Sequence, residues 1–351
     1  MNHHLTIWLC LQSIPFTVYF VLTVLIAPGC FSEQETISLD PNDYPYEFLE
    51  QRIEQTVKKE YHFVDLDGDL VDEKIVVSYG TKANESLILI TTHDERVFSQ
   101  INLPPTSMVT FSFADYVDGD RNRDLFVVSK EVDTIFARVI DVYTSRTLKK
   151  FPLFWKPDSL ERLPEDVGVE MIGLIRTETS PRAVLCVFTS SSRNMSFAPR
   201  GMAAFDVENG NRLWYFAMGA WPNKPTLKDV TGDDIPEIFV PAGAPGNGAS
   251  ANGIDDSHSY LISLDANGKK VWSKQLGGIF SRPSAFLADL DLDGEDEIIC
   301  TFTSANKVAE KSYVALFNAL TGRQIGKKEL GVCPSNSFPH VKELVSDDVY
   351  L

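Results

Sequence analysis

The stretch Asp65-Leu-Asp-Gly-Asp-Leu-Val-Asp-Glu-Lys-Ile-Val-Val joins an acidic phrase directly to an apolar run. Related stretches begin at Asp115, Asp229 and Asp289, and each is followed by a short segment rich in Ile, Val and Phe. A pattern that recurs along a chain indicates one supersecondary unit that is repeated and stacked. The sequence therefore predicts a repeat protein in which each acidic loop leads into a β-strand.

The spacing of the acidic residues is typical of calcium loops. With the first Asp as position 1, the first and last copies have carboxylates at positions 1, 3, 5 and 9: Asp65, Asp67, Asp69 and Glu73, then Asp289, Asp291, Asp293 and Glu297. Alternate residues of a tight turn point their oxygens inward, and calcium prefers oxygen ligands. We therefore expect bound Ca²⁺ with a structural role in these two copies.

The other two copies are less complete. The third has Asp229, Thr231, Asp233 and Glu237, and we expect weaker binding because a neutral hydroxyl replaces one carboxylate. The second has Asp118, Asp120 and Asp124 in phase, with Tyr116 at position 1. The alternative interpretation is that these Asp-Gly runs are only solvated turns.

These acidic phrases resemble the loops of the FG-GAP or VCBS repeat family, which occur in β-propellers such as the integrin α-chain head. The resemblance extends over residues 60–351. Two further segments, 204–214 and 264–272, are similar to hairpins of quinoprotein-type propeller repeats; they contain Asn209-Gly210 before Trp214 and Asn267-Gly268 before Trp272. Both resemblances imply an all-β fold, a β-propeller of four-stranded blades.

The clearest blade runs from Pro225 to Gly277. Turn residues divide it into four expected strands: 225–228, 237–241, 259–265 and 270–274. A degenerate unit at 169–188 lacks the acidic phrase, and a further start appears at Val341. Six blades are favoured, with seven or an incomplete ring as alternatives.

Residues 1–30 are predicted to form a signal peptide or a membrane or lipid anchor, because no charged residue occurs from Leu5 to Ser32. Cys30 follows a small residue and is a candidate lipoprotein cysteine. Residues 31–59 form an expected linker that could contribute to ring closure, with a helical pattern over 46–59. The protein is therefore expected to be exported: extracellular, periplasmic or anchored on the outer side of a membrane.

Charge and cysteine content exclude some classes. The formal net charge of −17 argues against nucleic-acid binding, which requires clustered Lys and Arg. The odd number of cysteines, five, does not form a disulfide framework. Cys186 and Cys300 lie at equivalent places in apolar strands and are predicted to be buried thiols.

Long loops are expected on the face opposite the acidic loops, because an up-and-down blade sends alternate connections to opposite faces. Binding residues often lie on such loops. The candidate ligand residues there are Arg193, Arg200, Trp221, Lys224, His258, Phe280 and Arg282. The alternative is that the aromatic residues plug the core and the arginines pair with acidic neighbours.

The favoured function is a non-catalytic, calcium-binding module that binds a protein or glycan. The alternatives are a propeller enzyme, similar to a quinoprotein dehydrogenase or a polysaccharide lyase, or a membrane-associated assembly subunit. No Gly-x-Ser-x-Gly or His-Glu-x-x-His motif is present, and the sequence identifies no catalytic residue.

Overall fold

The computed structural model describes residues 5–9, 20–24, 58–79, 86–103, 108–117, 123–131, 133–155, 167–190, 199–304 and 312–331. The chain divides into two compact units, residues 1–56 with 291–293 and residues 57–290 with 294–351. In the first unit, β1 (Leu5–Leu9) pairs antiparallel with β2 (Phe20–Val24). Nothing in the described ranges qualifies as a helix capable of spanning a bilayer.

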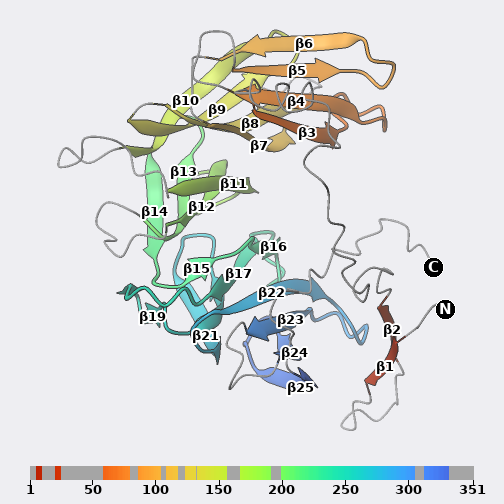
Figure 1. The fold of residues 1–351 in the computed structure, drawn as a ribbon, viewed down its shortest axis with the longest axis vertical. Helices are drawn as coiled ribbons and strands as arrows, with labels where there is room; N and C mark the ends of the chain where they lie inside the picture. Colours follow the sequence, from red (N-terminus) through yellow and green to blue (C-terminus); the bar gives the residue numbers. More distant parts are fainter. Residues whose placement is uncertain are drawn as a thin grey trace, which may run out of the picture. The chain divides into compact units, whose positions relative to one another are not determined.

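The described part of the second unit contains five antiparallel sheets of four or five strands (Figure 1). Their strands are consecutive in the chain, except that a small hairpin lies between two strands of the fourth sheet. Sheet 1 contains β3 (Lys58–Val64), β4 (Glu73–Tyr79), β5 (Leu87–Thr91) and β6 (Val97–Asn102). Sheet 2 contains β7 (Met108–Asp115), β8 (Asp124–Lys130), β9 (Thr134–Asp141) and β10 (Arg146–Trp155). Sheet 3 contains β11 (Gly168–Ile175), β12 (Ala183–Thr189), β13 (Gly201–Asp206) and β14 (Arg212–Ala217).

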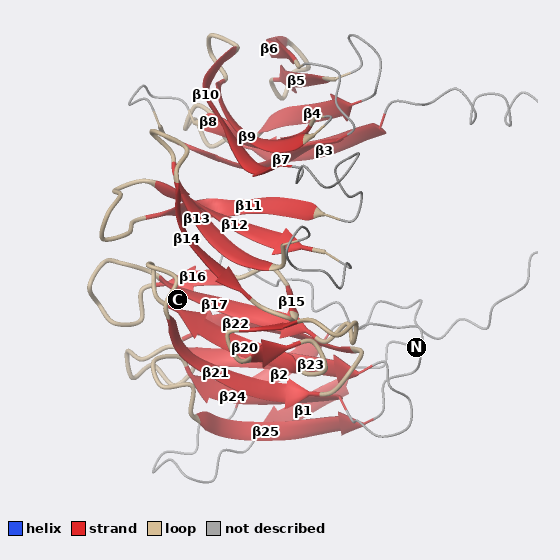
Figure 2. Ribbon diagram, turned by 90° about the vertical axis from the view of Figure 1, so that its left-hand side faces the viewer, coloured by secondary structure: helices blue, strands red, loops and turns tan. Residues whose placement is uncertain are grey.

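Sheet 4 has its first strand in two pieces. It contains β15 (Trp221–Pro222), β16 (Thr226–Lys228), β17 (Glu237–Gly243), β20 (Ser259–Leu264) and β21 (Lys270–Gly277), and a separate small hairpin is formed by β18 (Ser250–Ala251) and β19 (Ile254–Asp255). Sheet 5 contains β22 (Ser281–Ala288), β23 (Glu297–Ser304), β24 (Ser312–Asn318) and β25 (Gln324–Gly331). All described elements are strands, loops or turns (Figure 2).

These elements confirm the predicted all-β repeat of four-stranded, up-and-down sheets. The four strands expected between Pro225 and Gly277 are all present within a few residues of their expected ends. The prediction of a helix from the pattern over 46–59 is wrong at the end of that segment. Lys58 and Lys59 begin strand β3 and pair with Tyr79 and Ser78. The rest of that segment and the expected start at Val341 lie outside the described residues.

Successive sheets pack face to face through separate apolar clusters. Ile75 and Leu125 belong to the cluster between sheets 1 and 2, and Phe126 and Val184 to the one between sheets 2 and 3. A third cluster joins sheets 3 and 4, and a fourth joins sheets 4 and 5. This arrangement is that of propeller-type blades, in which each sheet is covered by the next.

Packing on both faces of a sheet removes the alternation between buried and exposed positions along its strands. In strand β8, six of the seven residues are buried. A sheet covered on both faces needs apolar side chains at successive positions. Cys186 on β12 and Cys300 on β23 confirm the predicted buried thiols, both in the second strand of their sheet. Burial raises the pKa of the Cys300 thiol to about 12.

Neighbouring sheets are also joined where the turn between the third and fourth strands meets an aromatic side chain of the preceding sheet. A Cβ atom on Gly210 would lie 2.3 Å from Cβ of Phe151, and one on Gly268 would lie 2.4 Å from Cδ2 of Trp214. Gly322 has the same relation to Trp272. Each of these glycines has a positive φ, so the turn requires Gly for its conformation and for the close approach.

Candidate metal centre

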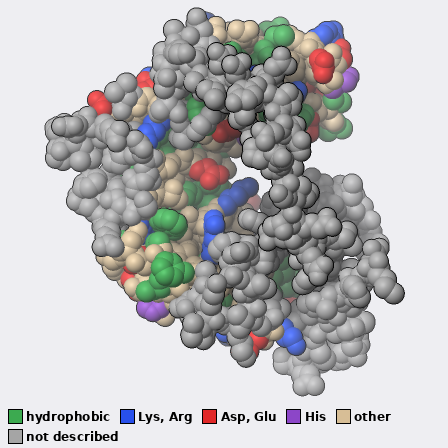
Figure 3. Space-filling view, in the orientation of Figure 1, with side chains coloured by type: hydrophobic (Ala, Val, Ile, Leu, Met, Phe, Trp, Pro, Cys, Tyr) green, Lys and Arg blue, Asp and Glu red, His purple; other side chains and the backbone are tan. Residues whose placement is uncertain are grey.

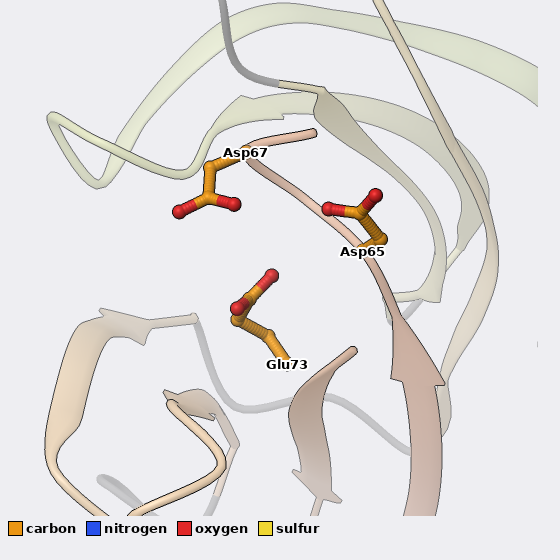
Figure 4. Close-up of side chains that lie close together, drawn as sticks. All are labelled: Asp65, Asp67 and Glu73. Atoms are coloured by element: carbon orange, nitrogen blue, oxygen red, sulfur yellow. The ribbon is translucent and has the colours of Figure 1, made fainter. Parts of the chain in front are cut away.

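The loop between β3 and β4 gathers three carboxylates. Asp65, Asp67 and Glu73 each offer an oxygen atom, and these atoms all lie within 4.8 Å of one another. Figure 4 shows the three carboxyl groups turned toward a common space. Asp65 follows β3 directly and Glu73 begins β4, so the pairing of the two strands holds the ends of the loop together.

Hydrogen bonds within the loop fix its shape. The Glu73 side chain is only 4% exposed, and its Oε2 accepts the backbone N–H of Leu66 at 2.8 Å. Asp65 accepts from Gly68 through Oδ1 at 2.7 Å and from Leu70 through Oδ2 at 3.2 Å. Part of the acidic set therefore has a turn-forming role that needs no metal.

The carboxylate at position 9 closes the loop in every acidic copy. Asp124 accepts the N–H of Val117 at 3.0 Å, and Glu237 accepts that of Val230 at 3.0 Å. Glu297 accepts the N–H of Leu290 at 3.0 Å. This repeated bond from position 2 to position 9 agrees with the predicted numbering, including Tyr116 at position 1 of the second copy.

The electrostatics of the first copy favour a cation. Burial raises the pKa of the Glu73 carboxyl, and the neighbouring Asp67, Asp69 and Asp65 raise it further, against the lowering effect of the Leu66 N–H. A positive ion among these groups would offset the repulsion. Carboxylates alone supply the side-chain donors, and such a donor set suits calcium better than zinc.

The last copy has the same three positions together. Asp289, Asp291 and Glu297 offer oxygen atoms within 4.8 Å of one another. Oδ2 of Asp289 accepts the N–H of Gly294 at 3.0 Å, whereas its Oδ1 is buried without a hydrogen-bond partner. A buried carboxylate oxygen without a donor is costly, so this atom fits a ligand position. Both acidic clusters could bind a metal ion.

The third copy repeats the turn hydrogen bonds of the first, with the Thr231 hydroxyl as an additional donor to position 1. Oδ1 of Asp229 accepts from the backbone of Gly232 at 2.7 Å and from the Thr231 hydroxyl at 3.3 Å. Desolvation raises the pKa of Asp229, but hydrogen bonds from Asp234, Gly232 and Asp233 outweigh it and lower the pKa overall. The loop itself supplies donors to this carboxylate, and the weaker binding expected where Thr231 replaces an acid stays a prediction.

The remaining predicted ligands divide as follows. Asp69 and Asp233 accept backbone N–H groups two residues further on, from Val71 at 2.8 Å and Ile235 at 2.9 Å. Asp293 is exposed in the last loop. Asp118 and Asp120 lie outside the described residues, and Asp124 begins β8. The three-carboxylate clusters therefore contain positions 1, 3 and 9 but not position 5.

The candidate ligand residues are not all at the surface. Arg200 is fully buried; it donates Nε to the carbonyl of Ser190 at 2.9 Å and lies 3.6 Å from Asp256. This placement matches the alternative interpretation, in which the arginine pairs with an acidic neighbour. Arg193 lies outside the described residues.

Other candidates are exposed. Trp221 is 39% exposed, and its Nε1 donates to the carbonyl of Ser190 at 2.6 Å. Phe280 is 61% exposed, with a φ of +63°. Arg282 donates Nε to Asn223 Oδ1 at 3.2 Å, and Lys224 is exposed. Figure 3 shows exposed apolar and basic side chains on one face of the molecule.

His258 belongs to a polar group that includes two residues not predicted as functional. Its Nδ1 lies 2.9 Å from Oδ1 of Asp255, and the Tyr260 hydroxyl donates to Oδ2 of Asp255 at 2.9 Å. The hydrogen bond to Asp255 contributes, after burial, to raising the pKa of Tyr260 to about 12. The spacing of Asp255, His258 and Tyr260 in the sequence did not predict this group, because their side chains are brought together by the placement of β19 and β20.

Comparison with known proteins identifies no family: no family model and no curated protein matches this chain. Among solved structures, the rhamnogalacturonan lyase YesW is 16% identical with a TM-score of 0.49, covering 80% of this chain and 51% of its own. The Bacillus licheniformis rhamnogalacturonan lyase PL11 is also 16% identical, with a TM-score of 0.49 and coverage of 79% and 51%. The Dos1 propeller is 11% identical, with a TM-score of 0.43 and coverage of 74% and 56%.

The chain therefore spans about half the length of these structures. All three TM-scores are below 0.5, and a likeness of this degree does not indicate an activity. The FG-GAP or VCBS resemblance is not confirmed by a family model. The strand topology, the repeat and the two acidic clusters describe the protein as an all-β chain of propeller-type sheets that could bind metal.

Proposed function

We propose that this protein is a calcium-binding β-propeller of the FG-GAP or VCBS type that acts, without catalysis, as a binding module for a protein or glycan. The observation that supports it most is the convergence of Asp65, Asp67 and Glu73 in one loop. The same three positions converge in the last copy, at Asp289, Asp291 and Glu297. Two loops far apart in sequence thus present one donor arrangement.

Calcium fits these loops because it accepts about six to eight oxygen ligands in flexible geometry. The carboxylates supply part of the set, and backbone carbonyls and water would supply the rest. The ion would join the ends of two adjacent strands in each of these sheets, so its role is structural. It would stabilise the fold and hold the loop face rigid.

A partner would bind on the opposite face, near the end of β17. Trp221 pairs with Gly243 on this strand, and Phe280 donates its backbone N–H to Ala244 at 2.7 Å. Two exposed aromatic side chains therefore flank neighbouring residues of one strand end. Aromatic faces next to the Asn223–Arg282 hydrogen bond suit a glycan or a protein loop.

The proposal includes a six-bladed closed ring and export of the protein. Additional β-structure beyond sheets 1 and 5 would complete the ring, and residues 1–30 would direct export as a signal peptide or anchor, with lipidation at Cys30 as one form. The enzyme and assembly-subunit alternatives have no separate observation in their favour among the described residues.

The test is thermal unfolding in excess calcium and in chelator. Wild type should show a higher Tm in calcium, because an ion that binds only the folded state stabilises it by about 2.7 kcal/mol at a concentration of 100 Kd. Asp67→Asn and Asp291→Asn should each reduce the calcium-dependent rise with little change in chelator, since Asn keeps a turn-forming oxygen. Asp133→Asn, at an exposed turn, is the matched control.

Equal losses of Tm in calcium and in chelator would show that these carboxylates only form turns and would refute the calcium proposal. Binding to a glycan array or to a panel of extracellular proteins tests the module proposal separately. Trp221→Ala should abolish that binding while Tm is retained. Loss of Tm with binding retained would assign Trp221 to the core instead.

A further inference from the structure

Sheet 5 has an apolar row on its outer face that no described strand covers. Phe286, Ile299 and Leu316 are register partners across β22, β23 and β24, so their side chains lie in one row on one face. Phe286 is 40% exposed, and the other two are half-buried. The opposite face of the sheet packs on sheet 4 through Ile298, Cys300 and their neighbours.

Sheets 1, 2 and 4 show what covers the position that corresponds to Ile299. The second residue after the position-9 carboxylate is Ile75 in β4, Phe126 in β8 and Phe239 in β17, and all three are fully buried in the cluster shared with the following sheet. Ile299 occupies the same position in β23, after Glu297, and is half-buried. Strand β23 alternates between buried and half-buried residues, whereas β17 is buried at six successive positions.

The covering element is the first strand of the next sheet. Strand β7 lies beside β4, β11 beside β8, and β22 beside β17. A face that met only water would favour polar residues at the outward positions. The outward positions of sheet 5 include the polar Ser284, Thr301 and Thr303 as well as the apolar Ile299, Val314 and Leu316. The apolar part of this face is suited to a sixth strand-forming segment.

The chain after β25 offers such a segment. Residues 341–345 read Val-Lys-Glu-Leu-Val, three apolar residues around a Lys-Glu pair, and are followed by Ser-Asp-Asp, so apolar residues again precede an acidic pair in the sequence. Nine residues, 332–340, separate it from the end of β25 at Gly331. The corresponding connections before β7 and β11 are five and twelve residues long, 103–107 and 156–167, so this length is adequate.

We propose that residues 341–345 form a strand that docks on the outer face of sheet 5, over Ile299 and Leu316. The docked segment is the first strand of a further blade, so this inference rests on the proposed six-bladed ring. The outer face of sheet 5 is then an intramolecular interface and not the ligand-binding surface.

Cysteine cross-linking in the full chain tests this placement. The background carries Cys10→Ser, Cys30→Ser and Cys333→Ser; Cys186 and Cys300 are retained because both are buried. Leu316→Cys is combined in turn with a cysteine at each position from 341 to 345, and the proteins are oxidised and examined on non-reducing gels. Thr147→Cys, exposed on β10 of sheet 2, replaces Leu316→Cys in the control series.

The expected result is a disulfide within the monomer at every second position of the scan, because alternate residues of a strand face the same side. The control series should give none. Cross-links between two chains would assign the face to a second copy and overturn the proposal, as would the absence of cross-links throughout the scan. The Tm is also measured on the same proteins in calcium and in chelator. A Tm that rises in calcium without cross-links refutes the docked strand alone. Cross-links without a calcium-dependent Tm refute the calcium role alone.

Discussion

Trp214 donates its indole Nε1–H to the carbonyl oxygen of Ala266 at 2.9 Å, from the fourth strand of sheet 3 to the hairpin of sheet 4. Trp272 makes the same bond to Ala319 of sheet 5 at 3.1 Å. Sheets 1 and 2 have a polar counterpart, with Ser99 Oγ 2.7 Å from Ser145 Oγ. The hairpins of sheets 2, 4 and 5 are therefore held by the preceding sheet through these hydrogen bonds, in addition to the apolar clusters between sheets.

Gly268→Ala should lower stability by about 3 kcal/mol. The positive φ alone costs an L-residue about 1–2 kcal/mol, and the added Cβ would overlap the Trp214 ring. Gly248→Ala is the control, because its φ is also positive but no atom lies within 4 Å of the added Cβ. Chemical denaturation should show a clearly larger loss for Gly268→Ala; equal losses would mean that the indole moves aside without cost.

Leu70→Gly should raise stability by about 0.5–1 kcal/mol when measured in chelator. Leu70 is 91% exposed with a φ of +68°, so the change relieves about 1–2 kcal/mol of backbone strain and loses no burial. The greater freedom of Gly in the unfolded chain offsets about 0.4–1 kcal/mol of this gain. Val71→Gly, next to it, has no such strain to relieve and should lower stability; the same result for Leu70→Gly would contradict the prediction.

Arg200→Met should lower stability by about 3–5 kcal/mol, because it leaves the buried Asp256 carboxylate without its cationic neighbour. The change also removes donors from the carbonyls of Ser190 and Gly219. Adding Asp256→Asn should recover part of the loss, although Asp256 also accepts N–H groups from Asn247 and Ala249. The stability loss of the double variant is compared with the sum of the losses of the two single variants. A loss greater than that sum would argue against charge pairing as the cause.

Asp255→Asn should lower stability at pH 7 by less than about 1 kcal/mol, as expected for a partly exposed group. Desolvation raises the pKa of Asp255, but hydrogen bonds from Tyr260, His258 and Ser257 outweigh it and lower the pKa below the ordinary 3.8. The carboxylate therefore contributes stability above pH 3.8, and this contribution is lost as the pH falls through the lower folded value. Urea unfolding at pH 7 and pH 3 should show the gap between variant and wild type narrowing in acid; a constant gap would contradict the assignment.

The fold class and the acidic loops were readable from the sequence because both depend on local pattern. Acidic phrases precede apolar runs in four of the five sheets, and Asn-Gly or Thr-Gly pairs mark the hairpins whose glycines have positive φ. The strands of the 225–277 unit follow the same logic. Where the local pattern was weaker, the prediction failed, as at Lys58 and Lys59, which belong to a strand because they pair with β4.

The sequence by itself determined that strands repeat, where acidic loops occur and which glycines bend the turns, since these depend on residues a few positions apart. Only the tertiary structure decided that positions 1, 3 and 9 converge, because position 9 is brought back to position 2 by the pairing of two strands. It also decided that Arg200 is buried beside Asp256, an arrangement set by packing between residues 56 positions apart, across two sheets. Charged residues at such distances give no periodic signal, so their pairing is a property of the packed sheets.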